Sequence, residues 1–260
     1  MTFDMHLHLH PNQDVGTLLR AMDAAGVDAG AICPVTGPDA DEAELNDHVA
    51  RAVAAHPDRL VGLCSLLPYA PETPDRLRAY LDRGFRGLKV HPSIQRFFPS
   101  EGRVRPAFEA AAEAGVPVLV HTTVVPIPGT RSRYDDPLEI DDLALELPEA
   151  TIVMAHGEPL GPAPAIAAKH ERVYMDTTST FARACRLIPG AGEDALEWMA
   201  MVSGVHGSDK TLYGSDAHPD RPDRIAWNLE PLRALRIAHD AKQKILGGNA
   251  LRLFGGPSGR

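Results

Sequence analysis

The chain has 260 residues, and its 26 Lys and Arg against 35 Asp and Glu give a formal charge of −9. This length suits one α/β barrel of ~200–250 residues better than two enzymatic domains. The negative net charge does not indicate a positively charged surface that would bind nucleic acid or an anionic membrane. No apolar run approaches the ~20 residues of a bilayer span, and the N-terminus shows no secretory signal. We therefore expect one cytoplasmic domain, residues 1–260, whose three cysteines are reduced.

Short apolar, β-branched runs alternate with amphipathic segments along the whole chain. The runs are apolar on both faces, as parallel strands covered by helices are, and the segments between them have a period near 3.6 and stop at Gly or Pro. This alternation predicts an α/β fold, a (β/α)8 TIM barrel, with a doubly wound sheet as the alternative. The predicted strands are Thr2–His8, Ala29–Cys33, Leu60–Leu66, Gly87–His91, Val116–His121, Ile152–His156, Val173–Asp176 and Thr211–Gly214. The predicted helices are Thr17–Ala25, Asp41–Ala55, Pro74–Arg83, Pro106–Ala114, Ala163–His170 and Glu193–Val205.

Polar residues gather where the predicted strands end, which in such a barrel is the site of catalysis. Side chains alternate along a strand with period two, so His6 and His8 point the same way, into the barrel mouth. His121 is expected on the same face of its strand as Leu119, and His156 on the same face as Met154. Other polar residues at strand ends are Lys89, His91, Asp176, Thr178 and Asp216. Of these, Asp176 and Thr178 are expected only to satisfy backbone groups.

A single histidine at a strand end is more often structural than a ligand. Here, however, His-x-His on the first strand is joined by His121, His156 and Asp216 at later strand ends. Burying several imidazoles and a carboxylate at one mouth is costly unless something pairs with them. A divalent ion would do so.

The order of these motifs resembles the amidohydrolase superfamily. Within it, the chain is similar to the amidohydrolase-related group, which holds TIM-barrel metal-dependent hydrolases and aromatic-acid decarboxylases. The resemblance covers essentially the whole chain and is more specific for the superfamily than for a substrate. Its motifs are Asp4-x-His6-x-His8, His56-Pro-Asp-Arg-Leu-Val-Gly-Leu, Gly87-Leu-Lys-Val-His-Pro, Val120-His121-Thr122, Met154-Ala-His156-Gly, Tyr174-Met-Asp-Thr-Thr-Ser, Tyr213-Gly-Ser-Asp216 and Gly248-Asn249-Ala-Leu-Arg-Leu-Phe254.

The resemblance implies one divalent metal ion held by His6, His8, His121 and Asp216. Three nitrogens and one oxygen with an open position suit catalytic zinc, and manganese or iron are the alternatives. It also implies that Asp216 is the general base and that His156 orients the water or stabilises the developing oxyanion. The expected reaction is attack of a metal-activated water on a carbonyl.

Three residues are expected to contact the substrate. Binuclear members of the superfamily carboxylate a lysine at the position of Lys89 to bridge two metals, but we favour Lys89 as a contact to a substrate carboxylate or carbonyl. His91 shares its parity and faces the same pocket or makes a structural contact before Pro92. Arg183 follows the seventh strand, and arginine is the natural partner of a carboxylate. A small, anionic substrate is therefore expected.

The first hypothesis is a metal-dependent hydrolase acting on an amide, lactone or ester. The first alternative is a non-oxidative decarboxylase of a small aromatic or unsaturated carboxylic acid, and such decarboxylases are commonly longer than this chain. The second alternative is a catalytically silent barrel that binds a ligand. The expected partner is a small molecule, with neither nucleic acid nor membrane, and the chain is expected to form a homodimer.

Overall fold

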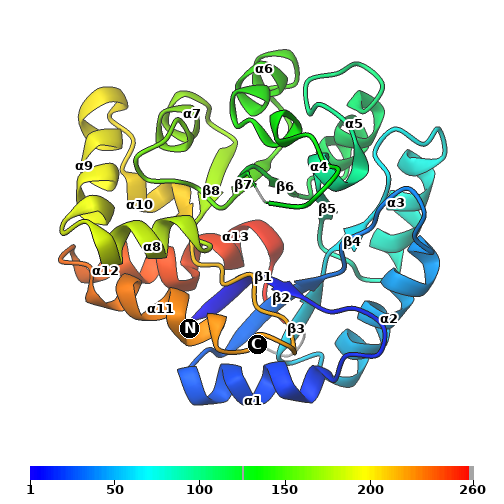
Figure 1. Ribbon diagram of the computed structural model, residues 1–260, viewed down its shortest axis with the longest axis horizontal. Coiled ribbons are helices and arrows are strands. Elements are labelled where there is room, and N and C mark those ends of the chain that lie inside the picture. Colours follow the sequence, from blue (N-terminus) through cyan, green and yellow to red (C-terminus); the bar gives the residue numbers. More distant parts are fainter. Residues whose placement is uncertain (125, 258–260) are drawn as a thin grey trace.

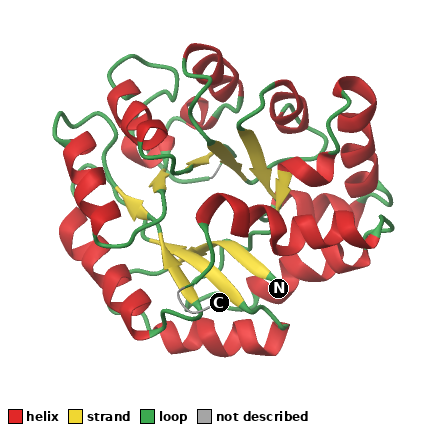
Figure 2. Cartoon of the chain, turned by 180° about the vertical axis from the view of Figure 1, so that it is seen from behind, coloured by secondary structure: helices red, strands yellow, loops and turns green. Residues whose placement is uncertain are grey.

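The computed structural model describes residues 1–124 and 126–257. Parallel strands lie at its centre and helices surround them (Figure 1). Figure 2 shows the same arrangement from behind, with the strands in yellow and the helices in red. The expected α/β fold is confirmed. Among the described residues, no helix combines the length and the apolar character that a membrane span requires.

The central strands are short and entirely parallel. Their bounds are β1 (Phe3–His8), β2 (Ala29–Cys33), β3 (Leu60–Gly62), β4 (Cys64–Ser65), β5 (Leu88–Val90), β6 (Val118–His121), β7 (Ile152–Ala155), β8 (Val173–Asp176) and β9 (Thr211–Leu212). Two sheets have the spatial orders β1-β2-β3 and β4-β5-β6-β7-β8-β9. Within each sheet, every strand pairs with the next in sequence, as successive strand–helix–strand units dictate.

Two seams join the sheets into a ring. The predicted third strand is interrupted only at Leu63, which connects β3 to β4. At the other seam, the N–H of Met5 donates to the carbonyl of Tyr213 at 3.0 Å. The N–H of His8 donates to the carbonyl of Ala217 at 2.8 Å. The segment that follows β9 therefore pairs with β1, and the ring is the expected barrel.

Helices cover the outside of this ring. The six predicted helices are confirmed, each with ends within two residues of those expected. The helix around Pro231 was not predicted, because an internal proline interrupts the helical pattern. The bounds are α1 (Val15–Ala25), α2 (Glu42–Ala55), α3 (Thr73–Asp82), α4 (Pro92–Gln95), α5 (Arg105–Glu113), the 3-10 turn η1 (Ser132–Asp135), α6 (Leu138–Glu146), α7 (Ala163–Lys169), α8 (Thr180–Leu187), α9 (Ala191–Ser203), α10 (Gly207–Lys210), α11 (Arg224–Ala234), α12 (His239–Gln243), the π-helical turn η2 (Lys244–Gly248) and α13 (Asn249–Phe254).

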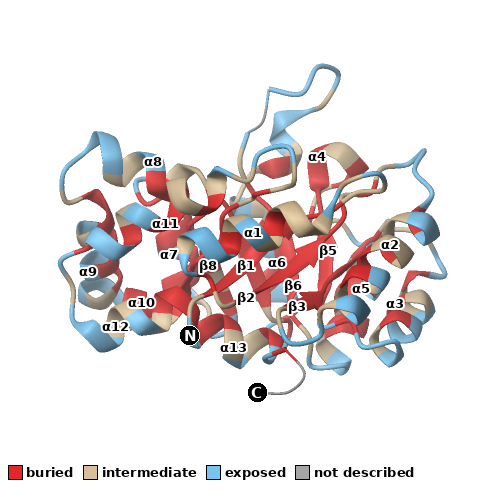
Figure 3. Ribbon diagram, turned by 90° about the horizontal axis from the view of Figure 1, so that it is seen from below, coloured by how far each residue is buried: buried red, intermediate tan, exposed pale blue. Residues whose placement is uncertain are grey.

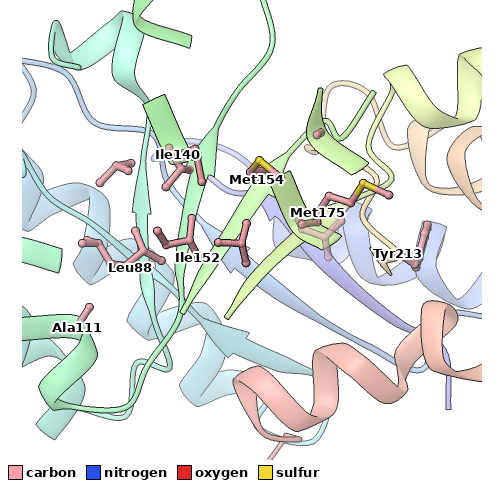
Figure 4. Close-up of a cluster of buried hydrophobic side chains, with 14 of the residues drawn as sticks. Leu88, Ala111, Ile140, Ile152, Met154, Met175 and Tyr213 are labelled. Carbon is pink, nitrogen blue, oxygen red and sulfur yellow. The ribbon is translucent and has the colours of Figure 1, made fainter. Parts of the chain in front are cut away.

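The buried side chains form two clusters, and alternation along the strands separates them. On β6, Val118 and Val120 belong to the larger cluster, which packs against the helices, whereas Leu119 belongs to the smaller one inside the barrel. Figure 4 shows part of the larger cluster, with Ile152 and Met154 of β7 among its labelled members. The parity expected for β6 is therefore correct.

Helix α13 closes the end of the barrel opposite the C-terminal ends of the strands. Phe254 and Ala250 of this helix pack with the interior cluster, which includes Phe3. The strands and the inner faces of the helices are buried, and the outer faces of the helices are exposed (Figure 3). The interior is therefore filled at one end, and polar side chains occupy the other.

Candidate functional site

An irregularity in β1 places two histidines side by side at the barrel mouth. Between Asp4 and Leu7, β1 has one residue more than its partner β2. Such a bulge re-aims the side chains that follow it. Met5 packs in the interior cluster, and His6 and His8 both lie beyond it at the mouth. Asp4 Oδ1 accepts the N–H of His6 at 3.1 Å and helps to hold this turn of the strand.

His6, His8 and Asp216 bring three donor atoms to one point. The Nε2 atoms of His6 and His8 lie 3.1 Å apart. Asp216 Oδ1 lies 3.0 Å from Nε2 of His8 and 3.8 Å from Nε2 of His6. The ligands of a tetrahedral zinc ion, with bonds of about 2.0–2.1 Å, lie roughly 3.3 Å from one another. The three atoms are therefore spaced to hold one small ion.

The hydrogen bonds behind these rings fix which nitrogen faces the site. Nδ1 of His6 lies 2.7 Å from Asp176 Oδ2, and Nδ1 of His8 lies 3.2 Å from the carbonyl of Cys33. Because both partners only accept, each Nδ1 carries a proton, and each ring is held with its Nε2 toward the site. Burial would lower the pKa of His8, but Cys33 and Asp216 outweigh this effect and raise it to about 10, so in the absence of a metal a proton lies between His8 and Asp216 where the ion would bind. The residues thus fit a divalent metal with oriented imidazole ligands.

The pKa values of His6 and Asp176 agree with this arrangement. Burial and the charge of Lys89 lower the pKa of His6 to about 3, against the opposing effect of Asp176. Burial would raise the pKa of Asp176, but hydrogen bonds from His6 and Thr178 help to hold it below its ordinary value. At neutral pH, His6 is therefore a neutral ligand and Asp176 a charged acceptor, the states that metal binding needs.

Asp216 is ionised and anchored on its far side. Burial would raise its pKa, but the hydrogen bond and charge of His8 outweigh burial and hold this pKa well below its usual value. Asp216 Oδ2 accepts a hydrogen bond from Nη1 of Arg224, and the same Nη1 also donates to the Asp216 carbonyl at 3.1 Å. The other oxygen, Asp216 Oδ1, faces His6 and His8.

His156 reaches the mouth through an unusual backbone conformation. Its strand neighbour Met154 faces the helices, so simple alternation would aim His156 outward as well. Its φ of 62° breaks this alternation at the end of β7. The His156 ring then lies 5.5 Å from that of His6 and 4.6 Å from that of His121, measured between centroids. Its Nδ1 is buried without a hydrogen-bond partner, which leaves a polar atom available for chemistry.

His121 lies near these residues, but its nitrogen atoms do not converge with the three donor atoms of His6, His8 and Asp216. Its ring stacks on His91 at a centroid distance of 3.8 Å, and these two side chains form a second group with the buried Asp135. Nε2 of His121 donates to the carbonyl of Thr123 at 2.7 Å, so its Nδ1 carries the free lone pair. The donor atoms of His91, His121 and Asp135 lie within 4.8 Å of one another, so these residues form a second candidate group for a metal ion.

Of the three expected substrate contacts, the structure brings only His91 to the cavity wall. Lys89 is 1% exposed and lies below the mouth, with Nζ 3.4 Å from Nε2 of His6. Burial lowers the pKa of Lys89. Arg183 lies on the exposed side of α8, away from the cavity.

A cavity of about 510 Å³ opens at this end of the barrel. Asp216 and Arg224 supply a carboxylate and a guanidinium to its wall. Thr122 and Asp135 line a neighbouring cavity of about 480 Å³, which shares His156 with the first. The full lining of the first cavity is His8, His10, Gln13, Val35, His91, Ile94, His121, His156, Asp216, His218 and Arg224.

Two important residues were not identified from the sequence. Arg224 lies eight positions beyond Asp216, in the first turn of α11, and no spacing rule connects the two. Asp176 was expected only to satisfy backbone groups. It does accept the N–H of His156 at 2.8 Å and of Thr178 at 2.9 Å, and it also orients His6. Its place at the end of a strand was the available signal.

A family model described as Amidohydrolase matches residues 3–256, which is nearly the entire chain. The chain belongs to the amidohydrolase family. The resemblance seen in the sequence motifs is thereby confirmed. No curated protein gives a significant match.

Several solved structures share the fold of this chain at low sequence identity. A 5-carboxyvanillate decarboxylase from Novosphingobium aromaticivorans, complexed with manganese and 4-hydroxy-3-methoxy-5-nitrobenzoic acid, is 19% identical, with a TM-score of 0.66 over 91% of this chain and 78% of that one. A 2,6-dihydroxybenzoate decarboxylase is 19% identical, with a TM-score of 0.72 over 98% of both chains. A protein named probable 2-pyrone-4,6-dicarboxylic acid hydrolase, from Acinetobacter baumannii with citric acid bound, is 16% identical, with a TM-score of 0.67 over 98% and 99%.

Proposed function

We propose that this amidohydrolase is a metal-dependent hydrolase that acts on a carbonyl of a small, anionic substrate. The observation that carries the proposal is the convergence of His6 Nε2, His8 Nε2 and Asp216 Oδ1 beside an open cavity. When bound there, a divalent ion would supply an activated water and polarise the substrate carbonyl. We propose zinc, because two imidazoles and a carboxylate suit it, with manganese or iron as alternatives.

We propose that His121 is the fourth ligand, because its Nδ1 lone pair is free and it lies next to His156. Asp216 would accept the proton released by the attacking water. His156 is the group placed to orient the water or to stabilise negative charge on the substrate oxygen. Burial lowers the pKa of His156, so the ring is neutral at pH 7 and can donate or accept a hydrogen bond.

The charge around the site favours an acid as the substrate. Lys89 lies beneath His6, and Arg224 lies at the cavity wall. We propose that His91 contacts the substrate directly and that Lys89 favours an anion from below. The carboxylate ligands named for two of the related structures agree with this proposal. A homodimer stays a prediction from the sequence.

A decarboxylase is the second candidate. Related structures of comparable similarity include decarboxylases and a hydrolase, and one decarboxylase matches over 98% of its own chain. Chain length therefore does not separate the two reactions. A metal site beside Arg224 would also hold the carboxylate of an acid about to lose carbon dioxide.

One experiment distinguishes these reactions. Zinc- and manganese-loaded protein would be incubated with a panel of small lactones, amides, esters and aromatic acids, and both hydrolysis products and carbon dioxide would be measured. We expect hydrolysis that is lost in metal-free protein and in His8→Ala. Release of carbon dioxide without hydrolysis would select the second candidate. Ligand binding without either reaction would indicate a catalytically silent barrel.

A further inference from the structure

Arg224 is the charged donor that both lines the mouth cavity and touches the candidate metal site. Its side chain is 31% exposed, and one of its nitrogens, Nη1, makes both of its contacts to Asp216. The described hydrogen bonds of Arg224 involve no other side-chain nitrogen. Its Nε and Nη2 donors are therefore available on the wall of a cavity of about 510 Å³.

The first turn of α11 holds Arg224 in this position. Asn228, one turn later, donates to the carbonyl of Ser215 at 2.9 Å and to the carbonyl of Arg224 at 2.9 Å. Asn228 is fully buried, and its Oδ1 accepts the N–H of Ser179 at 2.6 Å. The helix start is thus clamped to the segment that carries Asp216. A guanidinium fixed in this way loses little conformational freedom when a ligand binds.

We propose that Arg224 binds the carboxylate of the substrate and thereby selects acids over neutral analogues. The guanidinium plane presents parallel donors that match the two oxygens of a carboxylate. The anchor on Asp216 sets where that carboxylate lies relative to the metal site. This inference rests on the proposed function for the position of the reaction, but binding of an acid can be measured without turnover.

The test compares a matched pair of probes, benzoate and benzamide, which differ in charge and hardly in shape. Their dissociation constants would be measured by calorimetry on zinc-loaded wild type, Arg224→Gln, Arg224→Lys and Arg183→Gln, with the zinc content of each sample verified. Arg183→Gln is the matched control, because it removes the same charge from an arginine on the exposed side of α8.

We expect wild type to prefer benzoate over benzamide. Losing a charge-assisted contact in Arg224→Gln should weaken benzoate binding about 10- to 100-fold and leave benzamide nearly unchanged. Arg224→Lys should restore part of the preference, and Arg183→Gln should match wild type. Equal benzoate affinity in Arg224→Gln and Arg183→Gln would overturn the proposal. So would a parallel loss of both probes, or a wild type that does not discriminate between them.

These outcomes are separate from those of the proposed function. A protein that hydrolyses nothing in the substrate panel can still show the Arg224-dependent preference for benzoate. Conversely, an active hydrolase whose Arg224→Gln variant binds benzoate as wild type does would retain the proposed reaction and lose this assignment.

Discussion

At the scale of single residues, the site depends on groups that do not themselves face the cavity. Asp176 is fully buried and accepts hydrogen bonds from the His6 ring and from two backbone N–H groups. Asp4 Oδ1 accepts the N–H groups of His6 and Ser215, both at 3.1 Å. These two carboxylates connect β1 to the ends of β8 and β9. The geometry of the candidate metal ligands is therefore set by buried carboxylates that lie behind them.

Asp176→Asn should weaken metal binding without removing a ligand. Asp176 uses one oxygen for His6 and the other for the backbone of His156 and Thr178, whereas an asparagine offers a single oxygen. One side must lose its acceptor, so we expect a 10- to 100-fold loss of zinc affinity. Competition with a chromogenic chelator measures this loss. Asp141→Asn, which changes a carboxylate far from the mouth, should bind zinc as wild type does, and an equal loss there would refute the specific role of Asp176.

Asp4→Asn should change how stability depends on pH. Burial raises the pKa of Asp4 to about 7, although hydrogen bonds from Ser215 and His6 oppose this rise. Between about pH 4 and 7, the folded metal-free protein keeps a proton that the unfolded chain has lost, so its free energy of unfolding falls as pH rises. This effect amounts to at most about 4 kcal/mol. Urea denaturation of metal-free wild type and Asp4→Asn at several pH values should show a flatter profile for the variant, and parallel profiles would contradict this expectation.

Residue patterns predicted part of this site and missed the rest for physical reasons. Alternation placed His6 and His8 at the mouth, and Asp216 followed from its position after the last strand. The direction of His156 depends on a left-handed φ that a sequence does not reveal. Arg183 and Arg224 both follow strand ends, but only folding of the segment before α11 decides which of the two reaches the cavity.

At the scale of elements, the site requires β1, β8 and β9 to approach closely. Gly214 follows β9 where this approach is tightest, because a Cβ there would lie 2.8 Å from Thr178 Oγ1 and 2.9 Å from His6 Cβ. The neighbours are a proposed metal ligand and a hydroxyl, and both are buried. The sequence predicted each of these strands, but not how closely they pack, since packing distances depend on all the side chains between them.

Gly214→Ala should therefore push β1 and β9 apart at the metal site. We expect a loss of about 1–3 kcal/mol in the free energy of unfolding, as for other overpacked interiors, together with weaker zinc binding. Gly102→Ala is the control, because a Cβ at Gly102 meets nothing within 4 Å. Chemical denaturation and chelator competition measure the two effects. A Gly214→Ala protein with the stability and zinc affinity of Gly102→Ala would show that this contact is not tight.

At the scale of the whole molecule, the barrel divides stability and chemistry between its two ends. Apolar side chains of the interior cluster and of α13 fill one end, and the histidines and carboxylates occupy the other. This division is common to (β/α)8 barrels, where the strand ends carry function. The alternation of apolar strand segments with amphipathic helical segments was enough to predict the barrel. The closing helix α13 was not predicted, because its six residues are too few for a period of 3.6 to be distinct.

Phe254→Ala should destabilise the protein without changing its metal site. Phe254 is 2% exposed and packs with the interior cluster at the closed end. Its truncation should cost about 3–5 kcal/mol. Leu187→Ala, at a side chain that is 72% exposed, should cost less than about 0.5 kcal/mol. Denaturation gives both values, and zinc affinity of the folded Phe254→Ala protein should equal that of wild type. A large fall in affinity would show that the two ends are coupled.

The most direct measurement is the number of metal ions per chain. Wild type, His8→Ala and Asp216→Ala would be loaded with excess Zn²⁺, desalted and analysed by inductively coupled plasma mass spectrometry. We expect one ion per chain in wild type and almost none in either variant, because each variant removes one of three converging donor atoms. Wild type without bound metal, two ions per chain, or variants that retain the ion would contradict a single metal centre built on these residues.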